Sequence, residues 1–304
     1  MWYKGKMVLS VASYNFLRWH KNARVVTAFL LDFILCYLLT DKAVQFALER
    51  DTTMQIFEAF IWTFGDSNAI LLVSLLLLIL FADMPFITTA TPFYLMRTTR
   101  RVWVVGQMVY VALATMLFMV FTLFSTVVLT MQNAFTGNRW SRTAAALAYS
   151  GSGKELNLPS AVKAIEMSRP WQSMLWVLAL MLLYTLVMVL VMLLFNIWKG
   201  QIAGIAAVIS FSCYGLLLNP DNIKKVLHLP DQLSYKARVL VGWISPLNQA
   251  TFYMHNFGYD KLPTLGQTVA IGLALLAVLL ILTICAIRRY AFSFSGTEGK
   301  SCVM

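Results

Sequence analysis

Long apolar runs separated by short polar segments dominate the chain. Six runs are long enough to cross a bilayer as helices. In hydrocarbon the backbone must satisfy its own hydrogen bonds, which only helices and closed barrels can do. Because these runs of Leu, Val and Met lack the alternation of barrel strands, the pattern predicts an all-α protein with six transmembrane helices. The predicted spans are approximately 24–44, 68–84, 102–130, 171–198, 201–219 and 265–287.

The segment before the first run predicts a further helix, lying on the membrane surface. Residues 1–23 mix apolar side chains with Trp19 and the basic residues Arg18 and Lys21. Aromatic and basic side chains anchor helices at the inner membrane interface. An ordinary basic flank remains the alternative.

Two shorter apolar stretches are expected outside the spans. Residues 237–252 are interrupted by Gly242 and Pro246, which is typical of an interfacial or re-entrant piece. Residues 54–64 have apolar side chains at helical spacing and predict an amphipathic helix lying on the surface. The side chains concerned are Ile56, Phe57, Phe60, Ile61 and Phe64.

Composition supports membrane insertion. Of the 304 residues, 60% are hydrophobic and only 12% are charged, and the mean hydropathy is +0.72. A soluble domain carries about a quarter charged residues on average. Much of the surface is therefore expected to face lipid.

Charge sets the expected orientation. With the N-terminus inside, the inner segments carry twelve Lys/Arg and two acids, whereas the longer outer segments carry twelve Lys/Arg and ten acids. Short cytoplasmic loops are enriched in Lys and Arg. We therefore expect one domain, 1–304, with both termini cytoplasmic, outer segments at 131–170 and 220–264, and a cytoplasmic tail at 288–304.

Motifs for chemistry are missing from the sequence. His20, His228 and His255 lie far apart without metal-ligand spacing, and 150–156 (SGSGKEL) lacks the spacing of a phosphate-binding loop. No basic stripe interleaved with aromatics indicates nucleic-acid binding. We expect no enzyme activity, no catalytic residue, no metal site and no cofactor in this chain.

Asp32 lies inside the first predicted span. About eleven apolar neighbours at roughly −0.3 to −0.6 kcal/mol each outweigh roughly +3 kcal/mol for a central aspartate, so insertion is still favoured. Ionisable residues in spans face the bundle interior or a water-filled cavity and often mark a transport path. Asp32 is thus a transport-path candidate, and a purely structural hydrogen bond to a neighbouring helix is the alternative.

The inner loop between the second and third spans is unusual. Within residues 81–101, a mostly apolar pentapeptide, PFYLM at 92–96, precedes Arg97, Arg100 and Arg101. The positive-inside rule alone explains the arginines, and prolines end the second span. Neither explains apolar and aromatic residues in a cytoplasmic loop.

This plan resembles the permease subunits of ABC-2 type transporters, found in many Gram-positive bacteria. The resemblance is carried by TPFYLMRTTRRVWVVGQ at 91–107 and ISPLNQATFYMHNFG at 244–258, together with the six spans. It implies a multi-pass protein of the bacterial cell membrane that pairs with a second permease subunit, identical or related. It also implies a cytoplasmic ATPase partner that binds ATP and Mg²⁺, and transport that is usually export.

In that family the loop between spans two and three docks into a groove of the ATPase. The resemblance places this contact on Pro92, Phe93, Tyr94, Leu95, Met96 and Arg97, with Arg100 and Arg101 at the helix entry. Apolar knobs fill such a groove, and arginines bind carboxylates at its rim.

Two other classes of protein stay open. A secondary transporter or channel subunit is expected to show broken helices in two repeats and several intramembrane charges, whereas only Asp32 is found. A membrane sensor or assembly protein without transport needs no motif.

Overall fold

The computed structural model describes residues 2–17, 19, 22–82, 84–86, 95–96, 98–150, 153, 162–218, 220–226, 228, 230, 233–258 and 260–290. Helices make up almost all of the regular structure in these residues. The exception is a parallel pair of two-residue strands, β1 (Met54–Gln55) and β2 (Ala134–Phe135), in which Met54 lies opposite Ala134. The all-α prediction is confirmed, apart from this short ladder.

In this part of the chain, four helices are long and apolar enough to cross a membrane. The helices α3 (Glu58–Phe64) and α4 (Ser67–Phe81) are bent by 86° against each other and give a fifth candidate if they form one broken span. The apolar helix α11 (Gln201–Leu217) is shorter, at 17 residues. Each of the six predicted ranges therefore coincides with a helix, and four to five of them are candidate spans. The four long helices are α2 (Ala23–Glu49), α6 (Arg100–Thr130), α10 (Pro170–Lys199) and α15 (Leu265–Ala286).

The remaining elements are short and lie at the ends of these long helices. The 131–170 and 220–264 segments, expected as outer segments, contain most of them. They are α1 (Trp2–Leu17), η2 (Met131–Asn133), α7 (Arg142–Tyr149), α9 (Val162–Met167), α12 (Pro220–Val226), α13 (Ser234–Ile244), α14 (Pro246–Ala250), η4 (Phe252–Met254) and η5 (Ile287–Arg289).

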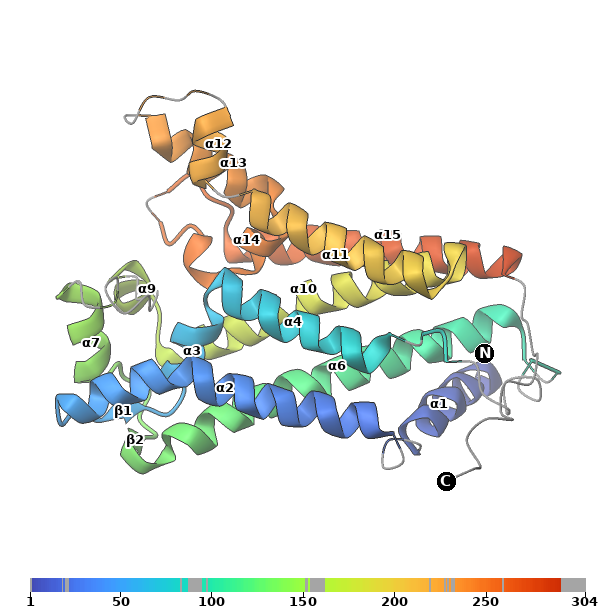
Figure 1. Cartoon of the computed structure of the whole chain (residues 1–304), viewed down its shortest axis with the longest axis horizontal. Helices are drawn as coiled ribbons and strands as arrows, with labels where there is room; N and C mark the ends of the chain where they lie inside the picture. The colour runs from blue at the N-terminus through green and yellow to red at the C-terminus, as the bar shows by residue number, and fades with distance from the viewer. Residues whose placement is uncertain are drawn as a thin grey trace.

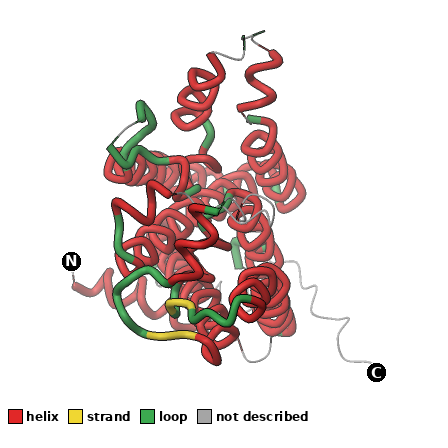
Figure 2. The backbone as a smooth tube through the Cα atoms, turned by 90° about the vertical axis from the view of Figure 1, so that its left-hand side faces the viewer, coloured by secondary structure: helices red, strands yellow, loops and turns green. Residues whose placement is uncertain are grey.

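The long helices run side by side, and together with α4 and α11 they alternate in direction along the chain (Figure 1). The helix α1 and the C-terminal end of α15 lie at one end of this bundle, here named the terminal end. The opposite end, named the distal end, carries α7, α9, α12 and α13. Viewed along the bundle, the helices are seen end-on as one packed cluster from which α12 and α13 project (Figure 2).

The centre of the bundle is α10, which packs against α11, α15, α6, α3 and α4. Pro170 occupies its first turn, where the missing N–H costs nothing. Gly200, with φ of +94°, ends the helix and lets the chain reverse into α11. The sequence thus marks both ends of this central helix.

The expectation for residues 54–64 was wrong. All seven residues of α3 are buried, including Phe60, Trp62 and Phe64, because α3 packs among α2, α4, α6 and α10. Only Ile56 and Phe57, before the helix, are partly exposed. An amphipathic surface helix keeps one polar face, and α3 offers only Glu58 and Thr63 for one.

The stretch 237–252 contains a break between two helices. The first, α13, ends at Ile244, and Pro246 begins α14 after Ser245, whose hydroxyl caps α14 by accepting from the Asn248 N–H. Leu247 and Ala250 are buried. This stretch is therefore bent and packed onto the bundle, and its depth in a membrane stays a prediction.

Candidate functional site

The predicted ATPase contact is described only in part. Leu95, Met96, Arg100 and Arg101 belong to the described residues, whereas Pro92, Phe93, Tyr94 and Arg97 lie outside them. Leu95 and Met96 have helical backbone conformation. Leu95 is half-buried against the core, and the Met96 side chain is 75% exposed. An exposed methionine therefore stands before the start of α6, at the terminal end.

Arg100 joins the start of α6 to the end of α15. Its Nη1 donates to the carbonyl oxygen of Tyr290 at 3.1 Å and to that of Arg288 at 3.4 Å. The last carbonyls of a helix lack partners within it and carry partial negative charge, which a guanidinium satisfies. Arg101 is exposed beside it. The structure thus separates the two arginines: Arg100 contacts α15 and η5, and Arg101 points to the surroundings.

The helix α1 also contacts α6 near its start. The Asn15 amide donates to Gln107 Oε1 at 3.0 Å, and the Trp19 indole N–H donates to the Tyr110 hydroxyl at 2.7 Å. At Gly106 an added Cβ would lie 2.8 Å from the Cβ of Val11, so glycine permits this close approach. The N-terminal segment and the end of α15 are therefore both attached to the first turns of α6.

Asp32 is 0% exposed, between α2 and α6. Thr122 Oγ1 donates to Asp32 Oδ2 at 2.9 Å, and the Cys36 thiol lies 3.8 Å from the Thr122 carbonyl oxygen. Among the described residues, Asp32 Oδ1 has no hydrogen-bond partner. Asp32 faces the bundle interior, as expected for an ionisable residue in a span. Its role in transport stays a prediction.

Glu58 is a second buried carboxylate, which sequence reasoning missed. It accepts from the Ser141 N–H at 2.7 Å, the Ser141 hydroxyl at 2.6 Å and the Gln55 N–H at 3.1 Å. Three donors on a buried carboxylate offset much of the cost of its burial. Glu58 thereby fixes the start of α3 to the start of α7. Its position as the only acid in an apolar stretch was the available signal.

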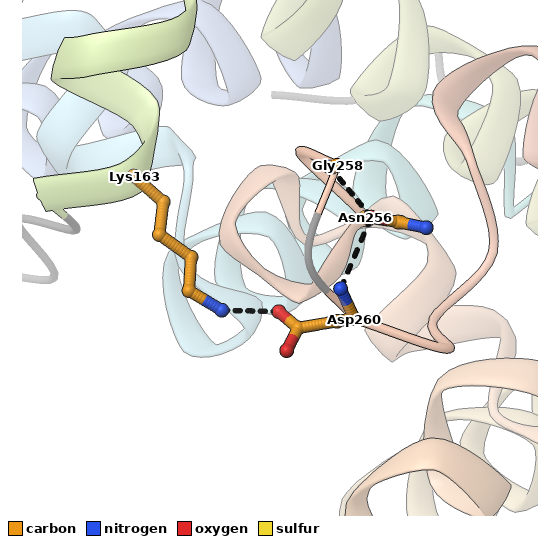
Figure 3. A network of polar contacts seen from close by, with 4 residues as sticks. All are labelled: Lys163, Asn256, Gly258 and Asp260. Carbon is orange, nitrogen blue, oxygen red and sulfur yellow. Dashed lines mark hydrogen bonds and ion pairs between the residues drawn. The ribbon is translucent and has the colours of Figure 1, made fainter.

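At the distal end, a polar contact links the 131–170 segment to the 220–264 segment (Figure 3). Lys163 of α9 forms an ion pair with Asp260, and Asn256 Oδ1 accepts from the Gly258 N–H at 2.7 Å and the Asp260 N–H at 3.3 Å. The paired side chains are partly exposed, and exposed ion pairs contribute at most about 1 kcal/mol. This network orders the loop before α15 without forming a reactive site.

Within the described ranges, no group of three His, Cys, Asp or Glu side chains is placed to hold a metal ion. In comparisons with known proteins, no family model matches the chain, and no curated protein or solved structure is significantly similar to it.

Proposed function

We propose that this chain is the permease subunit of an ABC-2 type transporter of the bacterial cell membrane, functioning as an exporter. ATP hydrolysis on a separate cytoplasmic ATPase drives it, and the ATPase docks on the loop between α4 and α6. Two permease subunits, identical or related, form the membrane part. The chain itself holds neither ATP nor Mg²⁺.

The course of the chain supports six crossings with both termini cytoplasmic. The helices α2, α4, α6, α10, α11 and α15 alternate in direction, and α1 and the C-terminal end of α15 both lie at the terminal end (Figure 1). Among the described residues, that end carries Lys6, Arg24, Arg100, Arg101, Lys199 and Arg288, which favours a cytoplasmic location. With 17 residues, α11 is about 25 Å long, so local thinning of the bilayer accommodates it. In this arrangement α1 lies at the inner membrane interface.

The exposure of Met96 carries the docking proposal. It lies at the end assigned to the cytoplasm, outside the lipid, and its side chain is 75% exposed. An exposed apolar side chain, followed five residues later by the exposed Arg101, suits a groove with an acidic rim. Neither ending a span nor setting topology requires a methionine at this position.

The contacts of Arg100, Asn15 and Trp19 connect α6 to neighbouring elements, so that a displacement of α6 is transmitted to them. All three attach neighbouring elements to the first turns of α6. A push on the loop before α6 therefore acts on α1 and α15 together with α6. Rigid-body displacement of packed helices is one of the ways in which proteins switch conformation.

A crosslinking experiment tests this proposal. A photoreactive amino acid replaces Met96 in the full chain in its native membrane, and captured proteins are identified by mass spectrometry. We expect capture of an ATPase with a phosphate-binding loop, and an at least tenfold loss of ATPase copurification in Met96→Glu. Met131→Glu is the matched control, because Met131 is 69% exposed at the other end of α6. Absence of an ATPase, or equal losses in both variants, contradicts the proposal.

One observation favours a second candidate, a proton-coupled secondary transporter: the buried Asp32 with its unpartnered Oδ1. Vesicles containing the purified chain and a pH-sensitive dye distinguish the two. Under the ATPase proposal, wild type and Asp32→Asn give the same proton entry as empty vesicles. Proton entry in wild type that Asp32→Asn abolishes supports the secondary transporter instead.

A further inference from the structure

The helix α13 lines two cavities of different chemistry. The first, of about 300 Å³, is here named the basic cavity, and Arg238 of α13 and Lys261 of the loop before α15 lie on its lining. The second, of about 220 Å³, is named the apolar cavity. Its wall comes from α10, α15 and the bend that joins α13 to α14, and most of its side chains are hydrocarbon. A charged cavity and an apolar one thus share a helix.

One face of α13 connects the two cavities. Residues three and four apart on a helix lie on the same side. The side chains that share this face are Tyr235, Arg238, Val239, Gly242 and Trp243. Arg238 lines the basic cavity and Trp243 the apolar one, and the helix rises about 7.5 Å between them. The two cavities are therefore neighbours along α13.

The loop before α15 packs on this same face. A Cβ at Gly242 would lie 2.7 Å from Leu262 Cδ2, so glycine permits the close approach. The Trp243 indole N–H donates to the Lys261 carbonyl oxygen at 3.2 Å. These contacts hold the Lys261 backbone beside α13, while its side chain is exposed and lines the basic cavity.

The basic cavity has an excess of positive charge. Arg238 and Lys261 are both exposed, and neither side chain forms an ion pair or hydrogen bond within the described part of the chain. Asp260, which also lines the cavity, is already paired with Lys163 (Figure 3). These four side chains therefore carry three positive charges against one negative. A guanidinium and an ammonium group that lack acidic partners suit a phosphate.

The two cavities lie at the depths of a lipid headgroup and of an acyl chain. Lys261 is four residues before the first residue of α15, and so lies where a predicted span begins. Tyr235 is 55% exposed and Trp243 41%, and such side chains favour the membrane interface. On α15 the apolar cavity extends from Thr268 to Leu275, about 5 to 15 Å inside the start of the helix. Half of the hydrocarbon core is about 15 Å thick.

The apolar cavity opens toward lipid. Ile271 is 39% exposed, Leu275 37% and Ile244 49%, and all three are on its lining. Two polar side chains of the wall are already engaged: Gln249 Nε2 donates to the Trp243 carbonyl at 2.6 Å, and the Thr268 hydroxyl lies 3.0 Å from His255 Nε2. A hydrocarbon chain can therefore enter from the bilayer without leaving either group unpaired.

We infer that this face of α13 binds an anionic phospholipid, taken from the leaflet at the distal end. Its phosphate contacts Arg238 and Lys261, and part of one acyl chain enters the apolar cavity. Basic pockets beside transmembrane helices are known to hold anionic headgroups. Apolar cavities of about 150 Å³ already hold a benzene ring, so one of about 220 Å³ takes a short length of acyl chain. The inference requires that the chain lies in a membrane and does not depend on the ATPase.

Photolabelling of the full-length chain in phosphatidylcholine vesicles tests it. The probes are phosphatidylglycerol and phosphatidylcholine with the same diazirine-bearing acyl chain, and mass spectrometry maps the labelled residues. In the apolar cavity, at Leu183 and Leu275, we expect at least tenfold more label from phosphatidylglycerol. Each basic side chain near a membrane favours an anionic lipid about fivefold. Leu273, 55% exposed at a similar depth but outside both cavities, should be labelled equally by the two probes.

A pair of double variants tests the headgroup contact. Arg238→Gln/Lys261→Gln should bring the two probes to equality in the apolar cavity. Lys225→Gln/Lys236→Gln removes the same charge from exposed positions of α12 and α13 outside both linings, and should keep most of the preference. Equal losses in the two double variants overturn the inference, because they indicate only a general attraction of the distal end to anionic membranes.

A pair of single variants tests the acyl-chain contact. Ile271→Trp fills the mouth of the apolar cavity and should remove at least nine-tenths of the label from Leu183. Leu273→Trp adds the same side chain outside the cavity and should leave that label in place. Equal labelling of Leu183 in the two variants overturns the inference. Unlabelled cavity residues in wild type, as a second copy covering them would give, overturn it too.

A soluble competitor separates a lipid from a free phosphate ester. Glycerol phosphate has the charged group of the headgroup without acyl chains, and in large excess it should lower the cavity label less than twofold. Complete loss of the label overturns the inference, because the basic cavity then takes a soluble anion in place of a lipid. Because no ATPase is present, all these outcomes are independent of the docking proposal.

Discussion

The helices α10 and α15 have nearly the same mean hydropathy but occupy opposite kinds of position. In the most apolar stretch of α10, 61% of residues are buried inside the chain, compared with 11% in α15. Both helices are apolar enough to leave water, so hydropathy cannot rank them. Contact with neighbouring helices makes the difference, because lipid tails are as apolar as leucine and packing decides association between helices in a membrane.

The consequence is a division of roles. The helix α10 holds the bundle together, while α15 leaves most of its apolar surface exposed. Tests of this comparison therefore place matched substitutions on the two helices or on their shared contact.

The largest effect is expected from truncating equivalent leucines. Leu193 of α10 is 0% exposed, and Leu193→Ala should lower the free energy of unfolding by about 2–4 kcal/mol through lost packing and the cavity left behind. Leu273 of α15 is 55% exposed, and Leu273→Ala should change it by less than about 0.5 kcal/mol. Unfolding in mixed micelles with increasing dodecyl sulfate measures both. Similar losses for the two variants refute the assigned positions.

A smaller effect is expected at Gly272, where α15 packs against Leu183 of α10. A Cβ at Gly272 would lie 2.2 Å from Leu183 Cδ2, so Gly272→Ala should push α15 away from α10 and cost about 1–2 kcal/mol. Gly266, on the same helix, has no atom within 4 Å of such a Cβ. Gly266→Ala should be neutral or stabilise by up to about 1 kcal/mol. The same unfolding assay measures both variants. If Gly272→Ala is as stable as wild type, the helices adjust to the added methyl group at no cost, which contradicts this prediction.

The smallest effect concerns the attachment of the distal end of α15. His255 lies outside the spans, contacts Thr268 and is buried, and burial lowers its pKa from the ordinary value of 6.5. The unfolded chain therefore binds the proton more readily. Neutral His255 should therefore stabilise the fold fully above pH 6.5. This stabilisation should be lost as the pH falls from 6.5 toward the pKa of His255 in the folded state.

Melting temperatures in detergent between pH 8 and pH 5 measure this dependence. Wild type should lose stability on acidification, and His255→Asn should flatten that part of the curve. An unchanged slope in the variant assigns the pH dependence to other groups.

For the candidate site, the sequence supplied residue types and left their partners open. Asp32 was conspicuous as a charge in an apolar run, but its contact with Thr122 joins residues 90 positions apart. Arg100 and Arg101 were equivalent in the sequence, and only the end of α15 distinguishes them. Glu58 was missed because its donors on Ser141 come from another segment. The helical spacing of apolar residues led to the wrong prediction that α3 lies on the surface. Spacing shows which side chains share one face of a helix, but it does not show whether other segments cover the remaining faces.

The sequence by itself determined the class of protein and the places where helices form. Apolar runs of this length must form hydrogen-bonded helices in lipid, because an unpaired backbone group there is too costly, and Pro170 and Gly200 already mark the ends of α10. Only the tertiary structure decided which helix is central, that α3 is enclosed, and that α15 stays largely exposed while α10 is buried. These features depend on contacts between segments distant in sequence. Hydropathy cannot distinguish helices that are equally apolar, whereas their side-chain contacts can.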